Sequence, residues 1–199
     1  MRAAGVAGLA LAVLALAAPG AAAFEAERAF RPGAVLGSLE AGGGSQVNLE
    51  RHRSQTGLDL WYAGVRAGYL PWGARGTGPL RGAAEVGLEA LYQRYVDPVD
   101  AFWAGLAAVG RYHFLALGRV VPYVELVAGA GGTDLRVREM DSPFAFYLAG
   151  GAGLALVVTD RTALYAGYRL VHLSNANLDT PNRGFEAHTG VVGVSVFLK

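Results

Sequence analysis

Three residue types that serve hydrolases stand close together near the C-terminus of this chain. His172 and Ser174 are separated by one residue, and Glu186 follows after a polar connection. A hydroxyl can attack an acyl carbonyl when an imidazole removes its proton and a carboxylate fixes the tautomer of that imidazole. The three residues therefore predict nucleophilic catalysis, with Ser174 as the nucleophile, His172 as the base and Glu186 as the residue that orients the base.

The same residues have a plainer interpretation, because His-x-Ser by itself is a weak pattern. All three could be ordinary polar side chains at the point where a strand meets water. Catalysis would also need hydrogen-bond donors for an oxyanion. The nearest candidates are Asn175, through its side chain or its backbone N–H, and the backbone N–H of Asn177. The elements that carry these residues must decide between the two interpretations.

Apolar residues recur at every second position through most of the chain, in segments of about 10 to 15 residues separated by turn residues. This alternation is typical of a transmembrane β-barrel. We predict an all-β fold, an eight-stranded antiparallel barrel, because closure leaves no strand edge exposed to lipid. The expected strands are 35–48, 57–70, 80–95, 101–117, 120–137, 143–158, 162–175 and 186–198.

Charged residues gather on one face of the predicted strands, since successive side chains of a strand point to opposite sides. Glu85 and Glu89 share parity, and Arg111, Glu125 and Arg169 occupy the corresponding face of later strands. Opposite charges that face inward can pair with one another. Eight strands leave an interior just wide enough for side chains, so we expect a plugged barrel and not a pore.

A soluble barrel or sandwich is the competing fold, and it would turn the apolar face inward. Aromatic residues near the strand ends favour the membrane barrel, whose apolar band is flanked by interfacial girdles. These residues are Trp61, Tyr69, Trp72, Tyr92, Tyr95, Phe102, Trp103, Phe144, Phe146 and Tyr147.

The N-terminus has the pattern of a secretory signal. Arg2 precedes an uncharged apolar run, and Ala21-Ala22-Ala23 offers a small-x-small cleavage site before Phe24. The run is short for a transmembrane helix, which needs about 20 apolar residues, although a retained anchor is the alternative. We predict a signal peptide over 1–23 and a single barrel domain over 24–199.

Export also predicts the direction of the barrel. With both termini in the periplasm, odd strands run outward and the connection 176–185 lies at the outer surface. The turn at 118–119 is short, as periplasmic turns are, whereas the link 71–79 is longer than that rule predicts. The candidate site would then lie at the outer end of the last two strands.

Strand parity places the three candidate residues on the lipid side. His172 and Ser174 share the parity of Leu170, and Glu186 shares that of Val192. A hairpin would bring the two strand ends together, since Cβ atoms of cross-strand neighbours are about 4.5–5.5 Å apart. Polar groups on a lipid-facing wall are functional candidates by default.

The stretch His172-x-Ser174-Asn175-Ala176, followed by Pro181-Asn182-x-Gly184-x-Glu186, resembles the lipid A 3-O-deacylases of the PagL type. The resemblance covers about 15 residues. It implies the same base, nucleophile and orienting residue, an oxyanion hole at Asn175, and a role for Asn182 in shaping the loop.

Two features depart from the pattern of that family and its membrane. Asn177 stands where the family has glycine, which leaves the conformation of the backbone there open. The chain ends on Phe197-Leu198-Lys199, whereas outer-membrane barrels often end on an aromatic residue. The second departure concerns assembly and not chemistry.

The resemblance implies hydrolysis of the ester-linked acyl chain at position 3 of lipid A, in the outer membrane of a Gram-negative bacterium. The expected partners are lipopolysaccharide and membrane lipids, no cofactor is expected, and a homodimer stays open. The alternatives are a non-enzymatic barrel with a structural, adhesive or stress-related role, and a barrel that conducts small apolar molecules.

Composition limits the other function classes. Of 17 Lys and Arg residues one lies in the predicted signal, which leaves 16 basic against 16 acidic residues and no electrostatic case for binding nucleic acid. The absence of cysteine excludes disulfides and thiolate chemistry. His52, His113 and His188 lack the spacing of metal ligands. Arg53, Arg94 and Arg183 could contact lipid A phosphates, but solvated loop arginines are the favoured interpretation.

Overall fold

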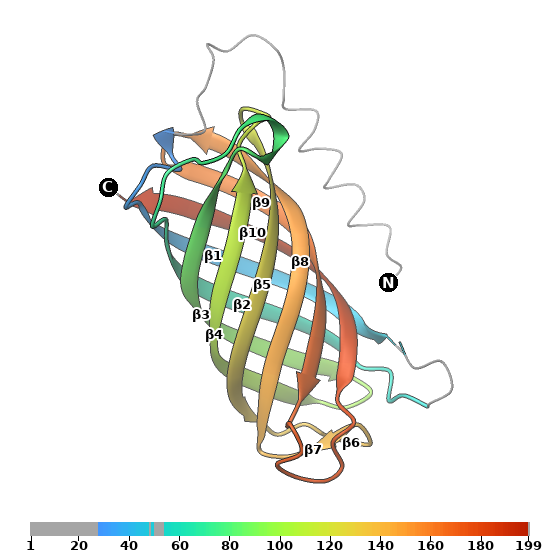
Figure 1. The fold of residues 1–199 in the computed structure, drawn as a ribbon. Coiled ribbons are helices and arrows are strands. Elements are labelled where there is room, and N and C mark those ends of the chain that lie inside the picture. The colour runs from blue at the N-terminus through green and yellow to red at the C-terminus, as the bar shows by residue number, and fades with distance from the viewer. Residues whose placement is uncertain (1–27, 48, 50–53, 199) are drawn as a thin grey trace.

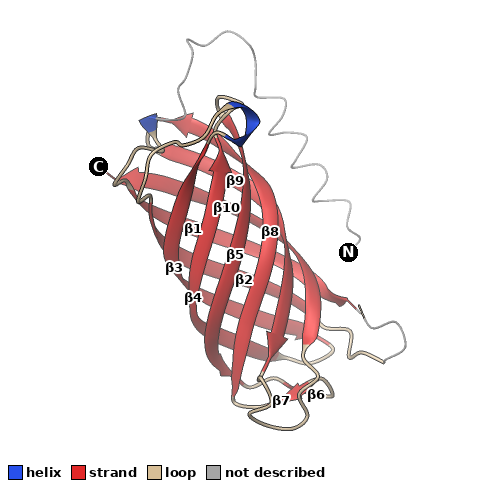
Figure 2. Cartoon of the chain, viewed as in Figure 1, coloured by secondary structure: helices blue, strands red, loops and turns tan. Residues whose placement is uncertain are grey.

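The computed structural model describes residues 28–47, 49 and 54–198. The predicted signal peptide, His52 and Arg53 lie outside the described residues. Strands make up most of the described chain (Figure 2). Within that part, no helix is both long enough and apolar enough to cross a membrane.

Eight long antiparallel strands close into a barrel in the order β1-β10-β9-β8-β5-β4-β3-β2 (Figure 1). Their bounds are β1 (Val35–Val47), β2 (Asp59–Tyr69), β3 (Gly82–Asp97), β4 (Ala101–Phe114), β5 (Val120–Thr133), β8 (Phe144–Thr159), β9 (Thr162–Ser174) and β10 (Phe185–Leu198). The predicted eight-stranded barrel is confirmed. The pairing of β1 with β10 leaves neither strand with an open edge, as burial in lipid requires.

The two ends of the barrel differ. At the end where β1 begins and β10 finishes, the terminal end, the long link 70–81 contains a 3-10 turn, η2 (Gly78–Leu80). At the opposite end, the loop end, the short strands β6 (Arg136–Val137) and β7 (Met140–Asp141) form a hairpin beyond the barrel wall (Figure 1). The predicted strand 120–137 therefore stops at Thr133, and its last residues belong to this hairpin.

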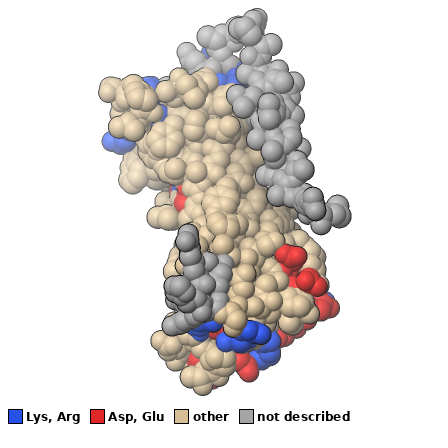
Figure 3. All heavy atoms as spheres, turned by 90° about the vertical axis from the view of Figure 1, so that its right-hand side faces the viewer, with Lys and Arg blue, Asp and Glu red and all other residues tan. Residues whose placement is uncertain are grey.

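Inward and outward faces follow the predicted parity. Leu88, Leu106 and Leu126 are 67%, 68% and 73% exposed on the outer wall, whereas Glu89 and Arg169 are fully buried. On the face shown in Figure 3, the middle of the wall is nearly free of charged atoms, and acidic and basic side chains gather at the loop end. An apolar outer wall with charges inside contradicts the soluble alternative.

The inward charges pair with one another as expected. Arg66 Nη2 lies 2.7 Å from Glu89 and 3.0 Å from Glu40. Arg169 binds Glu40 and, through its Nε, donates to Glu125 at 2.7 Å. We call these five residues the lumen cluster. Glycine makes room for it, because a Cβ at position 151 would lie 3.0 Å from Cγ of Arg169.

Two histidines take structural positions. His113 lies inside the barrel, where its Nε2 is 2.8 Å from Glu85. His188 lies on the outer wall and is hydrogen-bonded to the hydroxyl of Tyr168. Neither contact is that of a metal ligand.

Three of the predicted girdle aromatics are inside the barrel, so that part of the prediction was wrong. Tyr95, Trp103 and Tyr147 are fully buried, and Trp103 donates from its indole N–H to the carbonyl of Ala145 at 3.1 Å. In β3, β4 and β8 the odd positions face inward, because parity within each strand, and not nearness to a strand end, decides which face a side chain takes. In β2 the odd positions face outward, and Trp61 is 46% exposed on the outer wall.

Candidate active site

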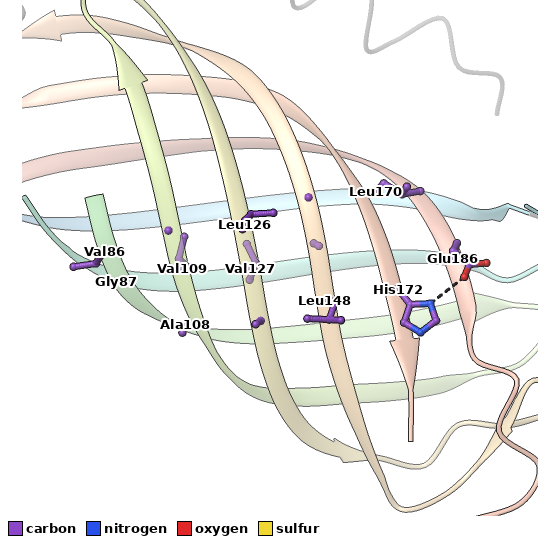
Figure 4. Close-up of a pocket in the computed structure, with 14 residues that line it drawn as sticks. Val86, Gly87, Ala108, Val109, Leu126, Val127, Leu148, Leu170, His172 and Glu186 are labelled. Atoms are coloured by element: carbon purple, nitrogen blue, oxygen red, sulfur yellow. Dashed lines mark hydrogen bonds and ion pairs between the residues drawn. The ribbon is translucent and has the colours of Figure 1, made fainter. Parts of the chain in front are cut away.

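The register between β9 and β10 sets Glu186 directly opposite His172. Nδ1 of His172 lies 2.9 Å from Oε1 of Glu186 (Figure 4). The two side chains are 38% and 28% exposed, so the pair lies at the surface of the outer wall. A carboxylate that accepts the Nδ1 proton leaves Nε2 of a neutral imidazole free to accept another. The pair thus has the arrangement of a general base and its orienting residue.

Ser174 lies beside this pair at the last position of β9. It is half-buried and shares the face of His172, two residues earlier. Gly184 lies against both, since a Cβ there would be 2.9 Å from Cε1 of His172 and 3.1 Å from Cβ of Ser174. Its φ of +68° is a conformation that glycine adopts without strain. The structure therefore brings all three predicted residues to one place.

A tight turn follows Ser174. The N–H of Leu178 donates to the carbonyl of Asn175 at 3.1 Å, and Ala176 and Asn177 have φ of 52° and 63°. Positive φ at both central residues defines a type I′ turn. Asparagine tolerates this left-handed conformation better than most residues. The departure from glycine at Asn177 is therefore compatible with the backbone found here.

The three asparagines form a closed set of hydrogen bonds. Asn182 accepts from the N–H of Asn175 at 2.9 Å and donates from its own amide to Asn177 at 3.1 Å. The N–H of Asn177 donates to Oδ1 of Asn175 at 3.0 Å, and Nδ2 of Asn175 donates to the carbonyl of Asp179 at 3.1 Å. The N–H groups considered for an oxyanion hole are thus engaged within the loop, which we call the catalytic loop (175–184).

The β6–β7 hairpin holds the catalytic loop from outside. The carbonyl of Glu139 accepts from the N–H groups of Arg183 and Gly184 at 2.8 and 3.1 Å, and Met140 forms a β-bridge with Asn182. The Glu139 side chain is fully buried. The sequence did not point to this residue, because a single glutamate that follows two arginines in a loop carries no recognisable motif.

Arginines at the loop end are engaged with protein groups. Nη2 of Arg183 donates to the carbonyl of Ser54 at 2.9 Å and to Glu139 at 3.1 Å. Arg94 pairs with Asp100 at 2.6 Å. Both arginines therefore have partners of their own before any phosphate is considered. In the described part of the chain, no three His, Cys, Asp or Glu side chains lie close enough to hold a metal ion.

A shallow groove of about 720 Å³ runs along the outer wall to the His172–Glu186 pair. In Figure 4 the pair lies at one end, and Val86 on β3 marks the other. Outward-facing small residues line part of the groove, among them Ala108, Ala128 and Gly150. The register places Ala128 beside Leu148, which itself lies beside His172. An apolar depression thus leads across the strands to the imidazole.

The family model described as lipid A 3-O-deacylase (PagL) matches residues 61–195, which is more than half of the chain and includes every candidate residue of the site. The chain belongs to the PagL family. It is accordingly a barrel of the Gram-negative outer membrane.

Solved structures agree on the fold. The crystal structure of the outer membrane enzyme PagL is similar with a TM-score of 0.59 and 19% identity, covering 78% of this chain and 97% of that one. Neisserial surface protein A is similar with a TM-score of 0.53 and 18% identity, covering 83% and 96%. At such identities the similarity concerns the barrel alone.

One curated relative has an unrelated description. The MFS-type transporter ucsM of Acremonium sp is 36% identical over 91 residues, which are 43% of this chain. The matched part spans only 15% of the transporter's length, so it says little about either protein's activity.

Proposed function

We propose that this protein removes the ester-linked acyl chain at position 3 of lipid A by serine-type hydrolysis. The observation that carries the proposal is the 2.9 Å contact between Nδ1 of His172 and Glu186, at the lipid-facing end of an apolar groove and beside Ser174. Family membership supplies the substrate. Because the His172–Glu186 pair lies on the lipid-facing outer wall, such an enzyme could act on lipid A without extracting it from the membrane.

The reaction would proceed in two halves. Nε2 of His172 takes the proton of Ser174, whose oxygen attacks the ester carbonyl. The tetrahedral intermediate collapses as His172 returns the proton to the departing sugar 3-oxygen, which leaves an acyl-serine. Water, deprotonated by the same imidazole, then attacks the acyl-serine, releasing the fatty acid and restoring the hydroxyl of Ser174. Glu186 holds the imidazole throughout.

For the oxyanion hole we propose Asn175, the position that the family resemblance implies. Its side chain is fully buried directly after Ser174, and one of its amide hydrogens is donated to the carbonyl of Asp179. Asn177 and Asn182 then act indirectly, because their hydrogen bonds fix Asn175. With both termini in the periplasm, the loop end lies outside the cell. The site is then level with the outer leaflet, where the sugar of lipid A meets its acyl chains, and the groove can hold the scissile chain.

The test is mass spectrometry of lipid A from cells that express the wild type, Ser174→Ala or Ser45→Ala. Ser45 is a matched control, because it is an exposed serine near the loop end of β1. Wild type and Ser45→Ala should each remove one ester-linked acyl chain, whereas Ser174→Ala should leave lipid A intact. Intact lipid A in the presence of folded wild type would contradict the activity. Deacylation by Ser174→Ala would contradict the nucleophile.

A homodimer stays a prediction of the sequence. Sedimentation of the detergent-solubilised barrel, with the mass of bound detergent subtracted, would decide it.

A further inference from the structure

Three connections at the loop end meet at Glu139, which lies between β6 and β7. They are the described part of the β1–β2 connection (54–58), the β5–β8 connection (134–143) and the catalytic loop between β9 and β10. Glu139 is fully buried, although it belongs to a short hairpin beyond the barrel wall. A buried carboxylate needs hydrogen-bond partners to offset the loss of water.

The carboxylate of Glu139 receives those partners from the other two connections and from the end of β1. Its Oε1 accepts from the N–H of Thr56 at 2.7 Å and from the amide of Gln46, at the end of β1, at 3.1 Å. Its Oε2 accepts from the hydroxyl of Thr56 at 2.6 Å. Arg183 donates to Oε1 at 3.1 Å from the catalytic loop. The charge-assisted bonds make this a rigid junction.

The backbone of the same residue reaches the site. The carbonyl of Glu139 accepts from the N–H of Gly184 at 3.1 Å. Gly184 is the residue whose backbone lies against His172 and Ser174, and Glu186 follows two positions later. If Glu139 moves, Gly184 is expected to move with it through this hydrogen bond, and Glu186 through the two intervening peptide bonds.

The neighbouring acidic residue, Asp141, is exposed where Glu139 is buried, and we do not expect its carboxylate to affect the site. Asp141 is on the same hairpin, but its carboxylate is 53% exposed and pairs with Arg136 at 2.7 Å. The backbone N–H of Asp141 donates to the carbonyl of Pro181 at 3.2 Å, but among the described residues its carboxylate has no hydrogen bond to the catalytic loop. The hairpin thus carries two carboxylates: that of Glu139 is hydrogen-bonded to the catalytic loop, and that of Asp141 is exposed to solvent.

We propose that Glu139 is a positioning residue for the deacylation site: its carboxylate anchors the hairpin so that the hairpin carbonyl fixes Gly184, and through it the alignment of Glu186, His172 and Ser174. This inference rests on the proposed function. It extends the site beyond the strands that carry the reacting groups. Catalytic groups need support of this kind, because a small misplacement lowers the rate steeply.

The test compares isosteric variants of the full-length barrel, refolded in detergent micelles and assayed with lipid A. In Glu139→Gln, kcat should fall by at least ~10-fold while KM stays within about twofold. The matched control Asp141→Asn changes the same group on the same hairpin and should leave both constants at the wild-type values. All rates are normalised to the heat-modifiable, folded fraction.

A double-mutant cycle tests whether Glu139 and Arg183 act through the same junction. Arg183→Gln should also lower kcat, and the double variant Glu139→Gln/Arg183→Gln should be no slower than Glu139→Gln alone, because both changes break the same junction. Thr56→Val, which removes one hydroxyl donor far from the reacting groups in sequence, should lower kcat by a smaller factor.

The outcomes are distinct. An inactive wild type would overturn the proposed function itself. An active wild type with a Glu139→Gln variant whose kcat per folded barrel is unchanged would overturn only the positioning role, and Glu139 would then merely stabilise the loops. Equal losses in Glu139→Gln and Asp141→Asn would also contradict it, since hairpin charge and not the junction would be responsible.

Discussion

The lumen cluster and the His172–Glu186 pair both join carboxylates to nitrogen-containing side chains, but they differ in exposure and in role. In the lumen cluster every carboxylate and guanidinium side chain is fully buried and paired with its neighbours. In the pair, imidazole and carboxylate are more than a quarter exposed, and the imidazole keeps one nitrogen for a further partner. Charges that are buried and paired with one another are part of the packed interior. An imidazole with an unused nitrogen at the surface can act on a substrate.

This contrast predicts that changes in the two regions separate activity from stability. His172→Gln removes the base without emptying the barrel interior. We expect kcat to fall by at least ~10³-fold, with little change in the urea midpoint of unfolding. A folded His172→Gln barrel that retained activity would show that another group accepts the serine proton.

The reverse is expected inside the barrel. Arg169→Leu removes the cation that binds both Glu40 and Glu125. Arg66 and Arg111 then remain as the cationic partners of three buried carboxylates, those of Glu40, Glu89 and Glu125. The free energy of unfolding should fall by about 3–5 kcal/mol, because breaking a buried pair leaves an uncompensated charge. Urea titration in detergent would measure this, with Leu39→Ala on the exposed outer wall as a mild control. The folded fraction of Arg169→Leu should keep the wild-type kcat. A lower kcat per folded barrel would contradict the prediction that interior changes affect stability alone.

The groove can be tested on the outer wall, where bulk is tolerated. A Cβ at Gly150 would lie 3.7 Å from Leu126, which is ordinary contact, so Gly150→Leu should fold but fill the groove. We expect deacylation to fall about tenfold, mainly through KM. Gly37→Leu is the matched control, because a Cβ at Gly37 on β1 meets nothing within 4 Å. Equal effects of both changes would argue that the groove does not hold substrate.

The smallest effect concerns pH. Burial raises the pKa of the Glu139 carboxyl, but hydrogen bonds from Thr56 and Gln46 outweigh it and leave that pKa below its usual value. A lowered pKa in the folded state adds stability above the ordinary carboxyl range, near ~4.3, which is lost as pH falls through the folded value. The gap in Tm between wild type and Glu139→Gln should therefore shrink as pH falls below about 5. A gap independent of pH would contradict the ionised junction.

Much of the barrel could be predicted from residue parity alone. Glu85, Glu89 and Arg169 lie at positions whose alternation admits only one face, so their inward direction needed no knowledge of contacts. The same rule, applied consistently, would have turned Trp103 and Tyr147 inward. Nearness to a strand end misled the prediction there, because girdle aromatics and lumen aromatics occupy the same levels of the barrel.

The site was predictable to the extent that it rests on the β9–β10 hairpin. A hairpin register fixes which residues face each other, so His172 and Glu186 could be paired in advance. The junction at Glu139 depends instead on how three separate connections fold over one another. Such contacts join residues 83 and 44 positions apart with no periodicity. The resemblance implied that Asn182 shapes the loop, but its hydrogen bond to the Asn175 N–H depends on the conformation of that loop and could not be read from residue spacing.

The most direct test of the account is to label the purified, folded barrel with an acyl-chain fluorophosphonate and locate the adduct by peptide mass spectrometry. An activated serine is phosphonylated when its neighbouring base removes the proton. The account predicts one adduct, on Ser174, with loss of lipid A deacylation in parallel and no adduct in His172→Gln. An enzyme that deacylates lipid A while Ser174 stays unlabelled would contradict it.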